Sequence, residues 1–488
     1  MPTKKFAATL AFMLIAFECG AGEPDENLIA AVAATSGLQA WQAGTGARTP
    51  LLVAQTGQPQ AGQGKIESAP AIPADTPTPS STETGQSPLD ESFGSVSHAD
   101  WVRETRRKAW QDTRFDLQVR SYYLDRDKYD DGQSEAWALG GSVGLKTGYF
   151  RERFALGMTG YTSQRLYGPE DKDGTLLLKT GQQSYTVLGE MYGEFLLNQD
   201  TRLSVGRRGI DTPYLNRSDS RMTPQTFEAI TVQGLYGGGE GEAGWRAGGG
   251  YFDKVKQRNA DEFVSMAAAA GAPQGIERGV YVGGGNYSKG DLSIGAIDYY
   301  SDDIINILYS EAKYAVPLRG GMRVQLALQY SDQRSVGDDL LRGADLSSRQ
   351  WGGKAELGMG GALFSVAYTA ASGDTGMQSP WDGYPGFTSV QIEDFNRDGE
   401  RAWMLRAAYN FASVKGLGVY GLWVHGSTPQ SPGQYAKDEY DFDLQWTPFS
   451  GALKGLMMRL RYAHVAQDDP AGSDLDDLRL MVFYTAAD

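Results

Sequence analysis

The sequence predicts an all-β protein, a transmembrane antiparallel β-barrel of about 18 strands. Three observations support this fold class. Apolar and polar residues alternate along many segments after residue 114, the N-terminus has the features of an export signal, and no run of about 18 apolar residues occurs. Alternation with a period of two is typical of β-strands that have one apolar and one more polar face. The missing apolar run excludes membrane-spanning helices.

Composition narrows the possible functions. The chain has 488 residues, and its 45 Lys and Arg against 60 Asp and Glu give a formal net charge of −15. This acidic balance argues against nucleic acid as a partner. Cys19 is the single cysteine, which excludes a disulfide framework and a cysteine-based zinc site in the body of the chain. With 3 histidines, a His-rich metal site is not expected either, and we expect no metal and no cofactor.

The first element is a signal peptide over residues 1–22. Lys4 and Lys5 precede the mostly apolar stretch Phe6–Phe17, and small residues surround Ala21. This order is typical of a secretory signal, and the apolar stretch is too short for a membrane span. A lipidated Cys19 is the alternative, but a glutamate stands directly before it, where a small residue is expected. We therefore expect export, with cleavage near Ala21.

A disordered periplasmic extension is expected over residues 23–98. The segment is rich in Gln, Pro, Thr, Ser, Ala and Gly, and Asn27–Trp41 could form one short amphipathic helix. Such a composition cannot bury enough apolar surface to offset the conformational entropy of ordering it. The barrel is then expected over residues 99–488.

The strands are read from the alternation. In Met322–Tyr330, Leu326 and Leu328 fall on one side and Gln325 and Gln329 on the other. The same pattern recurs in Tyr440–Trp446, Met458–Tyr462 and Trp403–Tyr409. A soluble sandwich would turn the apolar faces inward, whereas a membrane barrel turns them to lipid.

The membrane barrel is favoured over a secreted sandwich. No helical segment is long enough to form a second layer, and the polar faces suit a wet lumen. Aromatic residues gather near the expected strand ends, as an interfacial girdle requires, at Tyr122, Tyr123, Tyr299, Tyr300, Tyr330 and Trp446. At about 20 residues per strand with its connection, residues 114–488 make roughly 18 strands. A barrel of that size leaves an aqueous channel.

Several stretches, in order, resemble the OprD-type family of substrate-specific outer-membrane porins. The most specific is Thr212–Glu228, which is similar to the third-loop signature of the family. Further similar stretches are Phe115–Asp127, Ser134–Ala138, Asn396–Phe411, Gly451–Arg461 and Asp474–Tyr484. The chain departs from the family pattern in residues 23–98 and in ending Thr485–Asp488, where such barrels commonly end on an aromatic residue.

The resemblance implies a channel in the outer membrane of a Gram-negative bacterium. Its third loop would fold inward, and small solutes that carry a carboxylate would diffuse through it passively. Lumen-facing arginines would guide them, because a guanidinium fits a carboxylate at two points and conduction needs several weak sites. Strand phase gives the candidates Arg120, Arg208, Arg323, Arg406, Arg459 and Arg461. Here the resemblance would favour Arg207 over Arg208, whereas the alternation turns Arg207 toward lipid.

Acidic residues complete the expected pore. Asp441 and Asp443 are expected to form a facing wall that holds the cationic part of a zwitterion. Alternatively, they pair with Arg459 and Arg461 on a neighbouring strand and stiffen the wall. The other candidate arginines are, in the alternative, solvated charges near a rim. In the third loop, Asp219 and Arg221 either line the constriction or anchor the loop to the wall, and the sequence favours neither alternative.

Other functions are held open. An envelope-anchoring or interaction barrel, whose N-terminal extension binds a periplasmic partner, is the main alternative. An enzyme is not expected, since His425 and His464 lie in no motif of a serine hydrolase. The expected partners are small carboxylate or zwitterionic solutes, outer-membrane lipid and the outer-membrane assembly machinery, with the chain a monomer or a loose trimer.

Overall fold

The computed structural model describes residues 98–238 and 242–487. The expected signal peptide and nearly all of the expected N-terminal extension lie outside the described residues. Within them, none of the helices has the length and apolar character needed to cross a membrane.

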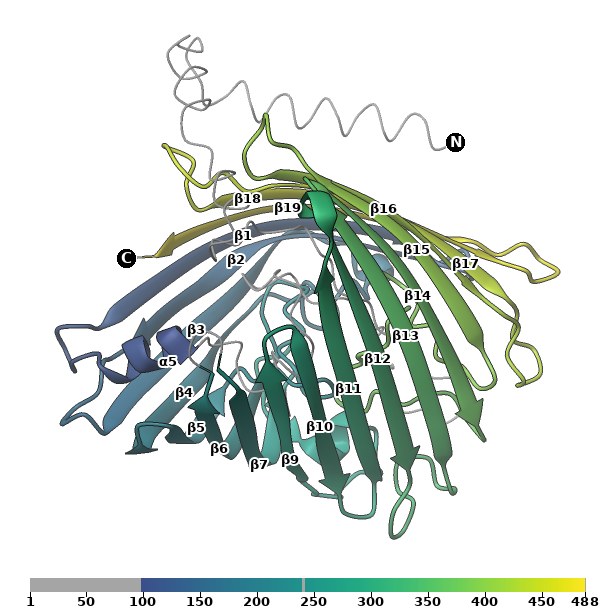
Figure 1. The fold of residues 1–488 in the computed structure, drawn as a ribbon. Helices are drawn as coiled ribbons and strands as arrows, with labels where there is room; N and C mark the ends of the chain where they lie inside the picture. The colour runs from purple at the N-terminus through teal and green to yellow at the C-terminus, as the bar shows by residue number, and fades with distance from the viewer. Residues whose placement is uncertain (1–97, 239–241, 488) are drawn as a thin grey trace.

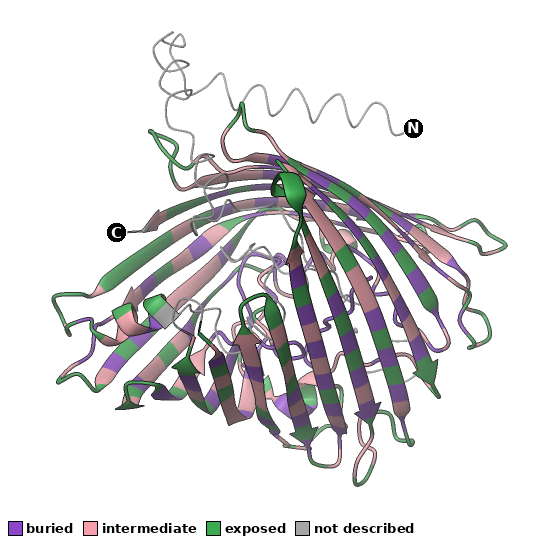
Figure 2. Cartoon of the chain, viewed as in Figure 1, coloured by how far each residue is buried: buried purple, intermediate pink, exposed green. Residues whose placement is uncertain are grey.

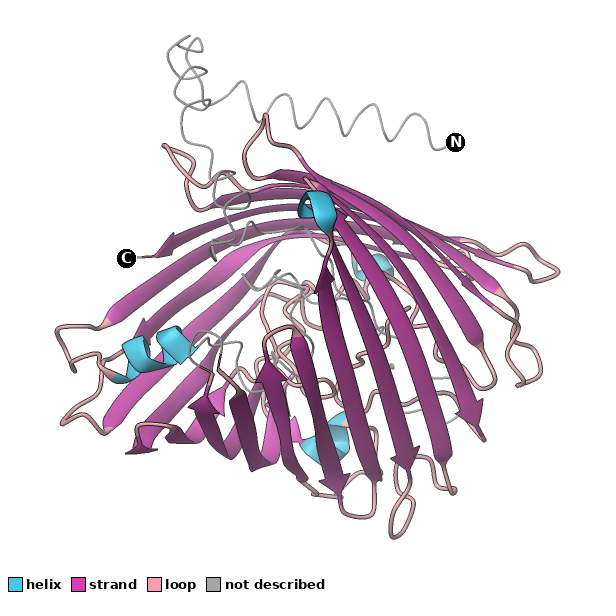
Figure 3. Cartoon of the chain, in the orientation of Figure 1, coloured by secondary structure: helices cyan, strands magenta, loops and turns pink. Residues whose placement is uncertain are grey.

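Antiparallel strands make up almost all of the regular secondary structure in the described residues (Figure 3). The strands are β1 (Arg114–Asp127), β2 (Gln133–Lys146), β3 (Phe154–Tyr167), β4 (Tyr185–Asn198), β5 (Thr201–Arg208), β6 (Thr226–Gly237), β7 (Gly244–Lys256), β8 (Val264–Ser265), β9 (Val280–Lys289), β10 (Leu292–Ser301), β11 (Ile305–Pro317), β12 (Arg323–Arg334), β13 (Ser347–Met359), β14 (Ala362–Gly373), β15 (Arg401–Asn410), β16 (Leu417–Gly426), β17 (Lys437–Trp446), β18 (Leu456–Gln467) and β19 (Leu475–Ala487). The helical elements are α5 (His98–Thr105), η1 (Glu170–Lys172), α6 (Met266–Ala269) and η2 (Arg319–Gly321).

The sheet closes on itself, as Figure 1 shows. Each strand pairs with its neighbours in sequence, and β1 pairs with both β2 and β19. The two residues of β8 pair with the end of β7 alone, while β7 also pairs with β9 around the barrel. The barrel therefore has 18 strands, which confirms the predicted fold class and strand number.

Burial alternates along the strands, which gives the stripes in Figure 2. On β12, Leu326 and Leu328 are exposed on the outer face, whereas Ala327 and Gln329 are buried on the inner face. The expected aromatic girdle is partly wrong. Tyr122 and Tyr299 are buried on the inner face, because each lies one residue out of phase with the outward positions. Tyr300 and Tyr330 are exposed as expected.

The two ends of the barrel differ in the length of their connections. Most connections at the end where β1 begins are short turns, and those at the other end include the long loops 209–225 and 374–400, which we call the third and seventh loops. Outer-membrane barrels have short periplasmic turns and longer extracellular loops, which sets the orientation. The largest apolar cluster lies inside the barrel, where Tyr214 and Leu215 of the third loop pack against Tyr299, Tyr309 and Trp381.

Candidate functional site

The third loop crosses the interior of the barrel. On one side, the Tyr214 ring packs edge-on against Tyr299 of β10, with ring centroids 5.7 Å apart, and its hydroxyl group contacts Ser331 of β12 at 2.9 Å. On the other side, Asp219 contacts Arg120 of β1. The strand order places β1 and β12 on opposite walls, so this loop narrows the lumen.

The contact between Arg120 and Asp219 shows whether Asp219 lines the constriction or anchors the third loop, which the sequence left open. Nη1 and Nη2 of Arg120 donate to the two carboxylate oxygens of Asp219 at 2.5 and 2.6 Å. Arg120 also donates to the carbonyl oxygen of Arg221 at 2.9 Å. Asp219 therefore ties the loop to the wall. The expected carboxylate-binding fork of Arg120 is filled by an internal carboxylate.

Arg221 lies deeper in the same loop and is buried. Its Nε donates to the carbonyl oxygen of Thr175 at 2.7 Å, and its Nη1 donates to that of Ser220 at 3.0 Å. Burial, together with the nearby charges of Arg479 and Arg258, lowers the pKa of Arg221. Arg221 thus brings a further positive charge next to the wall formed by β19.

Neighbouring strands β17 and β18 carry a cluster of three charged residues on their inner face, Asp443, Arg459 and Arg461. Nε and Nη2 of Arg459 each lie 2.8 Å from Oδ2 of Asp443, and Nε of Arg461 lies 3.0 Å from the same oxygen. Arg459 is 1 % exposed and Asp443 is 0 % exposed. The register makes Asp443 the direct partner of Arg461. Asp443 thus has the alternative arrangement given in the sequence analysis, pairing with arginines of a neighbouring strand, and does not form a separate wall facing them.

A second carboxylate repeats this arrangement on β19 and β1. Asp477 accepts from Nε of Arg479 at 2.5 Å and from Nε of Arg126 at 2.8 Å. Arg461 and Arg479 are direct cross-strand partners. Like charges placed opposite each other are destabilising, and the two aspartates offset this cost. Arg126 and Arg479 were not among the predicted pore residues, although the alternation puts Arg126 on the same face of β1 as Arg120.

The seventh loop covers this wall. Glu439 of β17 accepts from the backbone N–H groups of Ile392 and Glu393 at 2.7 and 2.8 Å. Asp441 accepts from the N–H of Gln391 at 3.1 Å. Asp441 therefore holds the seventh loop. Contrary to expectation, it does not form part of an open wall that could hold the cationic part of a zwitterion. Sequence reasoning had no signal for this second inward loop.

The remaining candidates are spread over the barrel. Arg406 lies on the inner face of β15, with its guanidinium 4.4 Å from the centre of the Tyr420 ring, whose hydroxyl group accepts from Arg461 at 3.4 Å. Arg323 is 52 % exposed at the periplasmic rim, where it pairs with Asp291 at 2.6 Å. Its strand phase is inward, but it lies at the first residue of β12, so it stands at the mouth and not at the constriction.

Arg208 and Arg207 follow the phase that alternation predicts. Arg208 faces inward, where it contacts Glu194 at 3.4 Å and Ser204. Arg207 pairs across the sheet with outward-facing Met191 and contacts Glu228 at 3.0 Å. Arg208 thus contacts Glu194, a carboxylate that also contacts Lys146, and does not join the arginines of β15 to β1.

We call Arg126, Arg406, Arg459, Arg461 and Arg479 the arginine row. It follows the inner face from β15 through β18 and β19 to β1. Within the row, Asp443 and Asp477 each serve two guanidiniums. The row therefore gathers five guanidiniums on one inner wall, next to Glu439 and Asp441, which hold the seventh loop.

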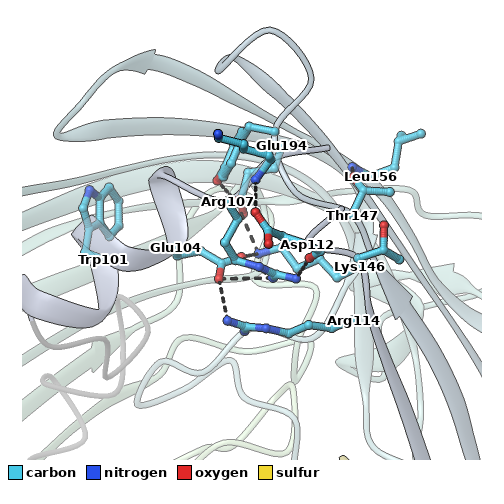
Figure 4. Close-up of polar contacts among 12 residues, drawn as sticks. Trp101, Glu104, Arg107, Asp112, Arg114, Lys146, Thr147, Leu156 and Glu194 are labelled. Atoms are coloured by element: carbon cyan, nitrogen blue, oxygen red, sulfur yellow. Dashed lines mark hydrogen bonds and ion pairs between the residues drawn. The ribbon is translucent and has the colours of Figure 1, made fainter. Parts of the chain in front are cut away.

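A helical strap closes part of the periplasmic end. Trp101 of α5 donates through its indole N–H to the carbonyl oxygen of Gln199 at 2.8 Å, and the guanidinium of Arg202 lies 3.6 Å from the centre of its ring. Figure 4 shows Glu104 of the same helix among basic side chains, with Arg114 at 3.3 Å and Lys146 at 3.0 Å. Residues 98–113, which we call the strap, are therefore held to the inner wall by packing and charge.

Buried Glu194 shares Lys146 with Glu104 of the strap. Lys146 and Arg208 each lie 3.4 Å from its carboxylate, Arg202 lies 3.9 Å from it, and Tyr149 donates to it. Burial raises the pKa of Glu104, but the opposing charges of Lys146, Arg107 and Arg114 outweigh it, so the pKa is lowered.

A closed barrel of 18 strands, with two loops folded into a charged lumen, defines a membrane channel of the porin class. The model of the outer membrane porins of the OprD family matches residues 108–487, and the chain belongs to that family. The predicted family and the predicted location, the outer membrane of a Gram-negative bacterium, are thereby confirmed. The strap begins before the matched region.

Individual relatives agree with this assignment. Porin D of Pseudomonas aeruginosa strain PAO1 is 26% identical over 416 residues, which is 77% of this chain and 90% of that protein. The structure of Pseudomonas aeruginosa OccK9 (OpdG) has a TM-score of 0.68 at 24% identity, covering 77% of this chain and 99% of that one. OpdK of the same organism, solved with vanillate, has a TM-score of 0.68 at 23% identity, covering 78% and 100%. OccK2 (OpdF), solved with glucuronate, has a TM-score of 0.65 at 20% identity, with the same coverage of 78% and 100%.

Proposed function

We propose that this outer-membrane porin passes small solutes that carry a carboxylate, by passive diffusion. The observation that carries the proposal is the arginine row, which places five guanidiniums on one inner wall of the lumen beside the seventh loop. These positive charges line the lumen, inside walls of low dielectric constant. Such an arrangement focuses the field and raises the local concentration of anions.

The row acts through its field more than through direct two-point contacts. Nε and Nη2 of Arg459 are already used by Asp443, and Arg479 is buried beneath the seventh loop, with its Nη2 3.4 Å from the carbonyl oxygen of Gln391. A solute therefore meets a positive potential and not an empty guanidinium fork. Weak attraction of this kind suits conduction, which requires that a solute also leave.

Two relatives support the solute class. OpdK was solved with vanillate and OccK2 with glucuronate, and both of these compounds carry a carboxylate. At 23% and 20% identity these likenesses show a shared fold. The solute preference of this chain therefore rests mainly on its own arginine row.

The test is the charge selectivity of single channels in a planar bilayer. Under a potassium chloride gradient, the wild-type reversal potential should indicate anion preference, and benzoate should permeate. Arg461→Gln should shift the reversal potential toward cation preference and lower benzoate flux. Arg207→Gln, which removes a charge from the outer face, is the matched control. An unchanged reversal potential in Arg461→Gln contradicts the proposal.

A second function is favoured by the strap. Trp101 and Glu104 fix the start of the described chain at the periplasmic mouth, and residues 23–97 precede it in the sequence. We propose that the extension binds a periplasmic partner, such as the cell wall, and that the strap passes this attachment to the barrel. Deletion of residues 23–97 should then weaken co-sedimentation with purified peptidoglycan and leave conductance unchanged. Equal co-sedimentation of both forms contradicts this role.

A further inference from the structure

The outer wall of β12 to β15 has an apolar groove. Leu326 and Leu328 border it on one side and Val366 and Tyr368 on the other, while Gly353 and Ala355 form its floor. The groove has a volume of about 380 Å³, within the range of roughly 300–1,000 Å³ that is usual for small-molecule sites. It faces the membrane, because Leu328 is 66 % exposed on the outer face.

The register explains the groove. Leu328, Gly353, Tyr368 and Trp403 lie in one row across the four strands, and Leu326, Ala355 and Val366 lie in the next. The two smallest residues therefore fall side by side between large neighbours. A Cβ atom added at Gly353 would meet its nearest neighbour, Leu328 Cδ2, at 3.8 Å, so the depression is open.

Aromatic rings lie at the extracellular end of the groove. Trp351 and Tyr368 have ring centroids 5.2 Å apart, and Tyr368 and Trp403 have centroids 4.5 Å apart. Tyrosine and tryptophan prefer the boundary between hydrocarbon and headgroups. The rings thus mark the level at which acyl chains give way to polar headgroups.

Exposed arginines lie directly beyond the rings. Arg334 and Arg349, both more than half exposed, share the carboxylate of Asp332 at 2.7 and 2.9 Å. Arg401 is exposed at the start of β15, two strands away from Arg349 and two residues along the strand direction, a backbone separation of roughly 12 Å. This end of the surface therefore carries three exposed guanidiniums, two of which share the carboxylate of Asp332.

We propose that this surface binds a phosphorylated outer-leaflet glycolipid, lipid A. One acyl chain would lie in the groove between Leu328 and Val366, and a phosphate would lie against Arg349 and Arg401. Guanidinium groups bind phosphate at two points, and such contacts are among the stronger hydrogen bonds. The order of groove, aromatic rings and arginines along the strands matches the order of acyl chain, backbone and phosphate in such a lipid.

Native mass spectrometry of the detergent-purified full chain tests the proposal. With added lipid A, the wild type should keep one lipid A molecule, and with added phosphatidylethanolamine it should keep none. An Arg349→Gln, Arg401→Gln double variant should lower the bound fraction about tenfold through lost charge-assisted contacts. Gly353→Leu should lower it equally by filling the groove.

Two controls match these variants. Arg207→Gln removes an outward charge elsewhere on the barrel, and Gly421→Leu adds a side chain at an outward glycine of β16, where an added Cβ atom would make only an ordinary contact, with the carbonyl oxygen of Asp441 at 3.8 Å. Both should bind lipid A as the wild type does, and heat-modified migration on a gel confirms folding of every variant. The proposal is overturned if the wild type shows no lipid A adduct, if the double variant or Gly353→Leu keeps as much lipid A as the wild type, or if the wild type binds phosphatidylglycerol as well as lipid A.

Discussion

Arg120 and Asp219 form a two-point ion pair that joins the first strand of the barrel to its third loop, at 2.5 and 2.6 Å. The pair lies across the lumen from Tyr214, which holds the same loop to β10 and β12. The loop is therefore fixed from both walls. The width of the constriction depends on a contact between residues 99 positions apart in sequence.

Asp219→Asn should release one end of the third loop. The substitution removes the charge that pairs with buried Arg120, at a cost of about 2–3 kcal/mol. We expect a lower melting temperature and noisier, larger single-channel currents. Asp211→Asn is the matched control, because its pair with Arg217 lies in the same loop but is exposed, and such pairs contribute about 1 kcal/mol or less. Quiet currents of wild-type size in Asp219→Asn would contradict the anchoring role.

Asp443→Asn should act in the opposite direction to Arg461→Gln. It leaves Arg459 and Arg461 buried with a neutral neighbour, so the lumen becomes more positive and the fold loses about 3–5 kcal/mol. We expect stronger anion preference in the reversal potential, together with a lower melting temperature. If both variants move the reversal potential in the same direction, the row does not set the potential of the lumen.

Glu439→Gln should loosen the tip of the seventh loop. The carboxylate of Glu439 accepts two backbone N–H groups, and a neutral amide oxygen accepts them more weakly. Hydrogen exchange of residues 391–393 should become faster, as measured by mass spectrometry. Asp438→Asn, on the adjacent outward position of β17, should leave this exchange unchanged. Unaltered exchange in Glu439→Gln would mean that other contacts hold the loop.

The attachment of the strap should depend on pH. Because the pKa of Glu104 is lowered below its ordinary value of 4.5, the ionised form stabilises the docked strap. This contribution is fully present above pH 4.5 and is lost as the pH falls through the lowered pKa. Hydrogen exchange of residues 98–107, corrected for the intrinsic rate, should therefore rise at acid pH.

Glu104→Gln should remove this pH dependence of hydrogen exchange. Trp101→Ala should make hydrogen exchange of the strap faster at every pH, since truncation of a buried tryptophan costs about 3–5 kcal/mol. A strap that stays protected at acid pH in the wild type would show that Trp101 alone holds it.

Much of the barrel was predictable because strand geometry is local. Alternation placed Leu328 outside and Gln329 inside, and it put Arg208 rather than Arg207 in the lumen. It also placed Arg459 and Arg461 on the same face. The prediction that Tyr122 belongs to the outward aromatic girdle was wrong for a different reason. It considered only that Tyr122 lies near a strand end, and not whether its position in the alternation points outward.

The partners of these side chains were not predictable in the same way. For Asp443 the sequence left open a facing wall or pairing with Arg459 and Arg461 on a neighbouring strand, and the register between β17 and β18 decided for the pairing. Nothing in the residues around Gln391 indicated that Glu439 and Asp441 would hold it. Cross-strand register and loop docking depend on contacts between distant segments, which an alternating pattern does not specify.

By itself, the sequence determined the strand class, the inward and outward faces, the approximate strand number and the family, because each depends on local periodicity or on short motifs. The tertiary structure alone decided which charges meet. It gave Asp443 and Asp477 two arginines each, filled the fork of Arg120 with Asp219, and brought a second loop into the lumen. The physical reason is that ion pairs form between side chains within about 4 Å, and closure of the barrel sets those distances.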